Sequence, residues 1–143
     1  MKTKSCLILL LCIAMLTGCT TTAPRSFTQT RSPSWSTIEL RDSLSYDKAW
    51  GVVFDILVKT FGIDQAIKED GYIRTGWLHT WSGKYTTGYR VRVTVKFSQD
   101  KSKLQIRSDA HFLSGKNWVS GTDTRLVSTL KTDIMGTVGR TTR

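Results

Sequence analysis

The chain has few cysteines, and their positions exclude several kinds of chemistry. Of its 143 residues only three are cysteine, and these are Cys6, Cys12 and Cys19. Beyond residue 19 the sequence therefore offers no disulfide, no thiol nucleophile and no cysteine-based zinc site. A chain of this length buries about two-thirds of its unfolded surface, so we expect a fold that needs neither a disulfide nor a metal for stability.

Histidine is also scarce, and the motifs of common enzymes are missing. The two histidines, His79 and His111, fall in separate predicted strands, and Asp109 is the only acidic residue within either strand. The sequence contains no HExxH motif, no nucleophile elbow and no phosphate-binding glycine-rich loop. We therefore expect no catalytic residue, no metal and no cofactor, and we predict that the chain is not an enzyme.

A long hydrophobic run is missing as well. The uninterrupted apolar stretch covers only residues 6–16, follows Lys2 and Lys4, and ends at Leu16-Thr17-Gly18-Cys19. A spanning helix needs about 20 apolar residues, which argues against the alternative of a transmembrane anchor. A basic start, a short apolar region and small residues at its end are typical of a signal peptide that is removed.

This order resembles a bacterial lipoprotein signal peptide that ends in a lipobox. The resemblance implies that signal peptidase recognises Leu16, Thr17 and Gly18 and cleaves before Cys19. Cys19 would then carry lipid on its sulfur and its new amino group, so that a membrane holds the protein by its first residue. The residue directly after the anchor is Thr20 and not an aspartate. The same resemblance therefore implies an outer-membrane location, with the domain facing the periplasm.

Composition divides the chain into three parts. Residues 1–18 are the predicted signal peptide. Residues 19–36 are rich in Thr, Ser, Arg and Pro, which predicts a lipidated flexible tether. Within this tether Phe27 is a candidate partner contact, and Trp35 is expected to dock on the edge of the domain. Residues 37–143 are predicted to form a single α+β domain.

Hydrophobic periodicity predicts the order β-α-β-β-β-β-α. The strands are expected at residues 37–44, 63–68, 72–81, 89–98 and 103–113, and the helices at residues 46–61 and 122–138. Trp50 begins a stripe of apolar residues at helical spacing, which predicts a core position. The Asp70-Gly71 pair predicts a tight hairpin turn.

These elements predict a two-layer α+β sandwich. An antiparallel sheet of about four or five strands is covered on one face by the two helices. The other face stays polar and exposed, as antiparallel sheets allow. Residues 82–88 and 114–121 are expected to be loops.

The excess of basic residues suggests a polyanionic neighbour. The formal net charge is +10, and export separates the protein from nucleic acid. Anionic lipid headgroups, lipopolysaccharide, peptidoglycan or an acidic protein remain as candidates. Strand alternation places a candidate binding patch on the polar face of the sheet: Arg74, Arg90, Arg92, Lys96, Lys103 and Arg107. The alternative is a solvated face with no specific partner.

Aromatic residues give a second set of candidates. Trp77 shares its alternation with Ile73 and is expected in the core. Trp81, Tyr85 and Trp118 are harder to bury and are candidate aromatic contacts with a partner. The alternative is that these three side chains pack over the open ends of a small core.

Four segments together resemble a known family. They are Ala49-Trp50, Phe61-Gly62-Ile63, the run from Asp70 to Trp77, and the run from Tyr89 to Val93. Their order is similar to the repeat of the BamC (NlpB) lipoproteins. That resemblance implies a helix-grip domain and a role as a non-enzymatic accessory of the outer-membrane β-barrel assembly machine. The family has two such domains and a long N-terminal segment, whereas this chain has one predicted domain and a short tether.

The sequence therefore favours a non-enzymatic envelope lipoprotein. We expect an accessory or scaffold subunit of an outer-membrane assembly complex, which contacts the membrane through its N-terminal lipid and binds an envelope protein that is acidic. The alternative is a binding module for an anionic envelope ligand such as lipopolysaccharide or peptidoglycan. An enzyme is the least favoured hypothesis.

Overall fold

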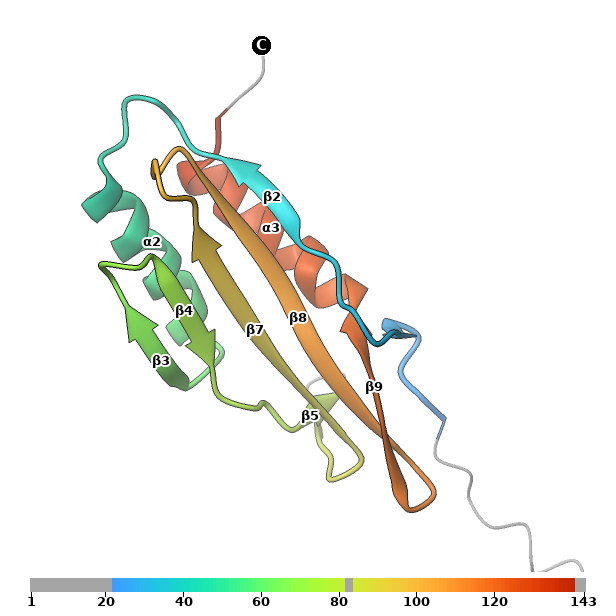
Figure 1. Cartoon of the computed structure of the whole chain (residues 1–143). Coiled ribbons are helices and arrows are strands. Elements are labelled where there is room, and N and C mark those ends of the chain that lie inside the picture. The colour runs from blue at the N-terminus through green and yellow to red at the C-terminus, as the bar shows by residue number, and fades with distance from the viewer. Residues whose placement is uncertain (1–21, 82–83, 141–143) are drawn as a thin grey trace, which may run out of the picture.

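The protein is an α+β fold in which an open antiparallel sheet carries two helices on one face. The computed structural model describes residues 22–81 and 84–140. Both helices lie behind the sheet in the view of Figure 1, and the face toward the reader is uncovered. The elements are β1 (Phe27–Gln29), β2 (Ser36–Glu39), α2 (Tyr46–Val58), β3 (Ile63–Ile67), β4 (Tyr72–Thr75), β5 (Thr80–Trp81), β6 (Lys84–Tyr85), β7 (Tyr89–Phe97), β8 (Lys103–Ser114), β9 (Asn117–Asp123) and α3 (Thr124–Val138).

The main sheet has seven strands, and β7 and β8 form its long centre. Its order is β1-β9-β8-β7-β4-β3, with β2 paired to β8 beside that path. One edge of β8 is shared, because β2 pairs with its first half and β9 with its second half. The far ends of β7, β8 and β9 extend beyond the helices (Figure 1). Strands β5 and β6 form a separate two-stranded hairpin.

Helix α2 begins where the sequence predicts. Ser45 is its N-cap and accepts a hydrogen bond from the Lys48 N–H, and Asp47 lies in the first turn. The face that turns toward the sheet buries Ala49, Trp50, Val53 and Leu57. The helix ends at the Lys59 C-cap, earlier than the predicted residue 61, although Phe61 still packs in the core.

Helix α3 is capped by Asp123, whose side chain accepts a hydrogen bond from the Leu126 N–H. It buries Leu130, Ile134 and Val138 against the sheet. The sheet supplies alternate aliphatic residues to the same core, and Val93, Val95 and Ile106 are completely buried. The prediction of two core-facing helices is confirmed, and so is the expected burial of Trp50, which is 9% exposed.

The predicted turn at Asp70-Gly71 is present between β3 and β4. Gly71 has a φ of +67°, which favours glycine. A Cβ atom at this position would also lie 2.7 Å from the Cβ of Phe97, so the site excludes larger residues by space as well as by conformation.

The prediction of about four or five strands is wrong, since the main sheet contains seven. One added strand is β9, which falls in the predicted loop at residues 114–121. A turn at Gly115, with a φ of +61°, folds it back onto β8. The other is β1, which falls in the predicted tether. Phe27 fixes it there, because its ring packs near the rings of Tyr89 and Phe112.

Two predicted strands are shorter than expected. The strand predicted at residues 72–81 stops at Thr75, where the Val93 N–H donates to Thr75 Oγ1 at 2.9 Å instead of to a backbone carbonyl. The strand predicted at residues 37–44 ends at Glu39, and Leu40 then forms a single bridge with Gly139. Both differences arise from contacts with segments distant in the sequence.

Candidate functional site

The uncovered face of the sheet carries most of the predicted basic patch. In β7, Val91, Val93 and Val95 are buried toward the helices, so the alternating Arg90, Arg92 and Lys96 lie on the opposite face. The β7–β8 register pairs Arg90 with His111, Arg92 with Asp109, and Thr94 with Arg107. The structure thus brings Arg90, Arg92 and Arg107 together on neighbouring strands.

Tryptophan side chains hold these arginines in place. The Arg90 guanidinium carbon lies 4.6 Å from the ring centroid of Trp77 and 4.7 Å from that of Trp118. Arg92 also lies 4.6 Å from the Trp77 centroid. At the other end of the cluster, Arg107 lies 4.7 Å from the centroid of Trp35. We name this cluster the Arg–Trp array and define it as Trp35, Trp77, Arg90, Arg92, Arg107 and Trp118.

Two polar residues of β8, Asp109 and His111, contact the arginines of the array. Asp109 lies between two of its arginines, with one oxygen 3.2 Å from Arg92 Nε and the other 3.7 Å from Arg107 Nε. His111 Nδ1 lies 3.2 Å from Arg90 Nε and accepts a hydrogen bond from it. The His111 ring also stacks on Trp77 at a centroid separation of 4.6 Å.

The surroundings of His111 favour its neutral form. Burial lowers the pKa of His111, and the positive charges of Arg90 and Arg92 lower it further, while Asp109 opposes the shift. A neutral imidazole can accept the hydrogen bond from Arg90, whereas an imidazolium cannot. Arg90 has no carboxylate partner among the described residues, so its charge is compensated only by aromatic rings and one imidazole.

The remaining members of the predicted patch behave differently. Arg74 lies 2.8 Å from Asp64 in an ion pair, and the hydrogen bond that its guanidinium donates to Asp64 raises the pKa of Arg74. Lys96 and Lys103 are exposed, and they pair in register with Tyr72 and Glu39, respectively. These three residues share the uncovered face but are not part of the array.

The three predicted aromatic contacts do not all lie in one part of the structure. Trp118 belongs to the array and is 41% exposed, whereas Tyr85 is 78% exposed on the small hairpin. Trp81 lies in β5, and its side chain is outside the described part of the structure. His79 lies near Tyr85, at a centroid separation of 6.2 Å, and does not join His111.

Sequence reasoning missed two members of the array. Trp77 was expected in the core because it shares its alternation with Ile73, but β4 ends at Thr75 and Trp77 stacks on the uncovered face instead. Trp35 was expected at the domain edge, and it lies directly before β2, against Arg107. The common alternation of Arg107, Asp109 and His111 in β8 was a usable signal, because it placed all three on one face.

This arrangement is suited to binding an anionic surface. Arginine presents a planar fork of N–H donors that matches carboxylate and phosphate. Stacking on tryptophan reduces the side-chain entropy that binding would otherwise remove. Within residues 22–81 and 84–140, no group of three or more His, Cys, Asp and Glu could hold a metal ion.

Neither a protein-family model nor a curated protein matches this chain. In the described ranges, every helix is too short or too polar to cross a membrane. The predicted signal-peptidase residues Leu16, Thr17 and Gly18 and the predicted lipid attachment site Cys19 lie outside the described residues.

Proposed function

We propose that this chain is a non-enzymatic lipoprotein of the outer membrane, an accessory or scaffold subunit of the BamC type that binds an acidic envelope protein through the Arg–Trp array. The observation that carries the proposal is the array itself, three stacked arginines on an uncovered sheet face. Tryptophan and arginine dominate the residues that supply most of the energy in protein interfaces.

The shape of the surface favours a protein over a small substrate. The array draws its side chains from β7, β8 and β9 and from the segments before β2 and after β4. These side chains stack on one another and do not surround a cavity. A partner that covers this face would remove Arg90 and Arg92 from water, where their interaction with a carboxylate is stronger.

The predicted anchor at Cys19 supports the membrane location. The first apolar run is too short to span a bilayer, and the Leu16-Thr17-Gly18-Cys19 segment has the lipobox pattern. We expect Cys19→Ala to prevent lipid attachment, and either to release the protein from membranes or to leave it unprocessed. Fractionation of membranes on a sucrose gradient measures this, and normal processing with outer-membrane recovery of the variant would contradict the anchor.

A second candidate function is the binding of an anionic envelope ligand, lipopolysaccharide or peptidoglycan. The observation that favours it is Arg90, which lacks a carboxylate partner among the described residues, together with the exposed Lys96 and Lys103 on the same face. Such binding would depend strongly on salt, because exposed charges are screened over about 8–10 Å at physiological ionic strength.

A photo-crosslinking amino acid distinguishes these functions in intact cells. Ser120 is exposed and pairs in register with His111 beside the array, whereas Ser128 is exposed on α3. We expect a crosslink to one acidic envelope protein from position 120 and a much weaker one from position 128. Crosslinks to lipopolysaccharide or peptidoglycan would favour the second function. Equal crosslinking from both positions would contradict a binding role for this face.

A further inference from the structure

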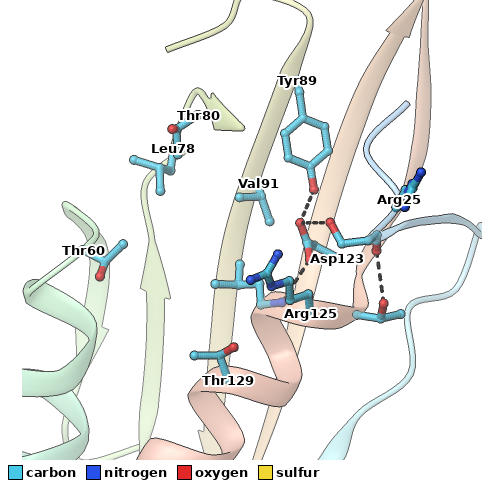
Figure 2. Close-up of a pocket in the computed structure, with 12 residues that line it drawn as sticks. Arg25, Thr60, Leu78, Thr80, Tyr89, Val91, Asp123, Arg125 and Thr129 are labelled. Carbon is cyan, nitrogen blue, oxygen red and sulfur yellow. Dashed lines mark hydrogen bonds between the residues drawn. The ribbon is translucent and has the colours of Figure 1, made fainter. Parts of the chain in front are cut away.

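We propose that a groove between the helices and the sheet binds the acyl chain of a single-chain anionic lipid taken from the membrane. This inference rests on the proposed lipid anchor, but it concerns the helix-covered face and not the Arg–Trp array. The groove lies beyond the end of α2, beside Tyr89 and Val91 of β7 and the first turns of α3 (Figure 2).

The groove is large enough for such a ligand. Its wider part is a cleft of 1050 Å³ over Tyr89 and Val91, next to the first turns of α3. A second cavity of 350 Å³ runs between α2 and α3, and both cavities are lined by Thr60, Leu126 and Thr129. Ligand pockets are typically about 300–1,000 Å³, so the wider cleft alone has room for one acyl chain.

The lining of the groove is suited to hydrocarbon. Leu78, Val91 and Leu126 form apolar walls in the wider part, and Ile56, Phe61 and Leu130 continue them between the helices. Burial of methylene groups against such a surface favours binding of an acyl chain. The threonine side chains on the rim can be solvated, so they do not oppose an apolar occupant.

The charges at the wide end select an anionic headgroup. Arg25 and Arg125 line the cleft and are exposed, and neither side chain has a hydrogen-bond or ion-pair partner among residues 22–81 and 84–140. Asp123, drawn with both arginines in Figure 2, is the only carboxylate among the described residues that line this cleft. The narrow end carries Lys59 and Asp133, whose charges balance.

Asp123 does not repel an anion strongly, because its carboxylate is buried and already accepts three hydrogen bonds. It is 8% exposed and accepts hydrogen bonds from the Tyr89 hydroxyl at 2.5 Å, from Ser26 Oγ at 3.0 Å and from the Leu126 N–H at 3.0 Å. Burial and Asp123 both raise the pKa of Tyr89, so its phenol stays protonated and remains a donor. The net charge that faces the mouth is therefore positive.

The position of the groove fits a membrane source for the ligand. Arg25 follows the predicted anchor Cys19 by six residues. Because a chain spans at most about 3.6 Å per residue, the wide end lies no more than roughly 20 Å from the lipid surface. The wide end, with Arg25 and Arg125, therefore lies within reach of the membrane surface.

The test uses the full chain in vesicles of phosphatidylethanolamine and phosphatidylglycerol. The probe is lysophosphatidylglycerol with a photoreactive diazirine at the end of its acyl chain, and mass spectrometry locates the adducts. We expect adducts on peptides that contain Leu78 or Leu126. A lysophosphatidylcholine probe with the same acyl chain should give much less labelling, since its headgroup carries no net charge.

A pair of charge variants makes the test specific. Arg25→Glu with Arg125→Glu should lower adduct yield about thirtyfold, because each of these two basic residues near a headgroup contributes about 1 kcal/mol. The matched control, Arg31→Glu with Lys116→Glu, changes the net charge equally at exposed positions that do not line the groove. Both variants should melt at the native temperature.

Vesicle flotation separates this inference from the proposed function. A chain that fails to float contradicts the anchor, and probe added below its micelle concentration then tests the groove directly. Adducts spread over the uncovered sheet face, equal labelling by both headgroups, or equal yields from the two charge variants would each overturn the inference. A groove occupied by a protein segment in place of lipid would also overturn it.

Discussion

The two faces of the sheet are built from the same strands but are stabilised by different interactions. On the helix-covered face, β7 presents Val91, Val93 and Val95, each at most 4% exposed. On the uncovered face it presents Arg90 and Arg92, which stack on tryptophan. One nine-residue strand therefore contributes to both the core and the candidate binding surface.

This comparison teaches which changes should affect folding and which should affect binding. The covered face is held by burial of apolar area, which is not directional and contributes about 25 cal/mol per Å². The uncovered face is held by directional contacts at partly exposed sites, where each contributes less. Substitutions on the two faces should therefore separate loss of stability from loss of binding.

The largest effect is expected on the covered face, at Trp50. This side chain packs at a centroid separation of 5.8 Å from Phe97 and 6.1 Å from Tyr46. We expect Trp50→Ala to lower the free energy of unfolding by about 3–5 kcal/mol. Urea denaturation measures this free energy of unfolding, and Trp118→Ala is the control on the uncovered face. A variant of Trp50 as stable as that control would remove the distinction between the faces.

An intermediate effect is expected for Trp77, which contacts two arginines and His111. We expect Trp77→Ala to lower the free energy of unfolding by about 1–2 kcal/mol, because two cation–π contacts are lost. Crosslinking from position 120 should fall at the same time, since Arg90 and Arg92 lose a common support. Native crosslinking by this variant would show that the arginines need no tryptophan to bind.

A smaller effect is expected from pH, through His111. Its pKa is lowered in the folded protein from an ordinary value of 6.5, so the unfolded chain binds a proton more readily. Stability contributed by neutral His111 is therefore present above that value and is lost as pH falls through the lower, folded pKa. We expect His111→Gln to weaken the fall in melting temperature between about pH 7 and pH 5. Identical pH profiles for the two proteins would contradict this assignment.

Local patterns in the sequence predicted the parts of the fold that depend on neighbouring residues. The cap at Ser45, the apolar stripe from Trp50 and the turn at Gly71 are each determined within a few positions, and the structure confirms them. The strand at Phe27 could not be predicted in this way. It forms because Phe27 packs near Tyr89 and Phe112, and these residues are distant in the sequence.

The candidate site was predictable for its arginines and not for two of its tryptophans. Period-two alternation in β7 and β8 placed Arg90, Arg92 and Arg107 on one face. Trp77 follows the break at Thr75, and the alternation that suggested a core position for it no longer applies there. Trp35 reaches Arg107 only because β2 pairs with the first half of β8.

The central claim is that the uncovered face binds without contributing much to folding, and Arg90 tests it most directly. Arg90→Gln removes the charge between Trp77 and Trp118, and Lys116→Gln is the control at an exposed turn. Unfolding free energy and crosslinking from position 120 are measured on the same preparations. We expect Arg90→Gln to stay within about 1 kcal/mol of native stability and to lose most of the crosslink. Full crosslinking at native stability would contradict the claim and leave this face a solvated side of the sheet.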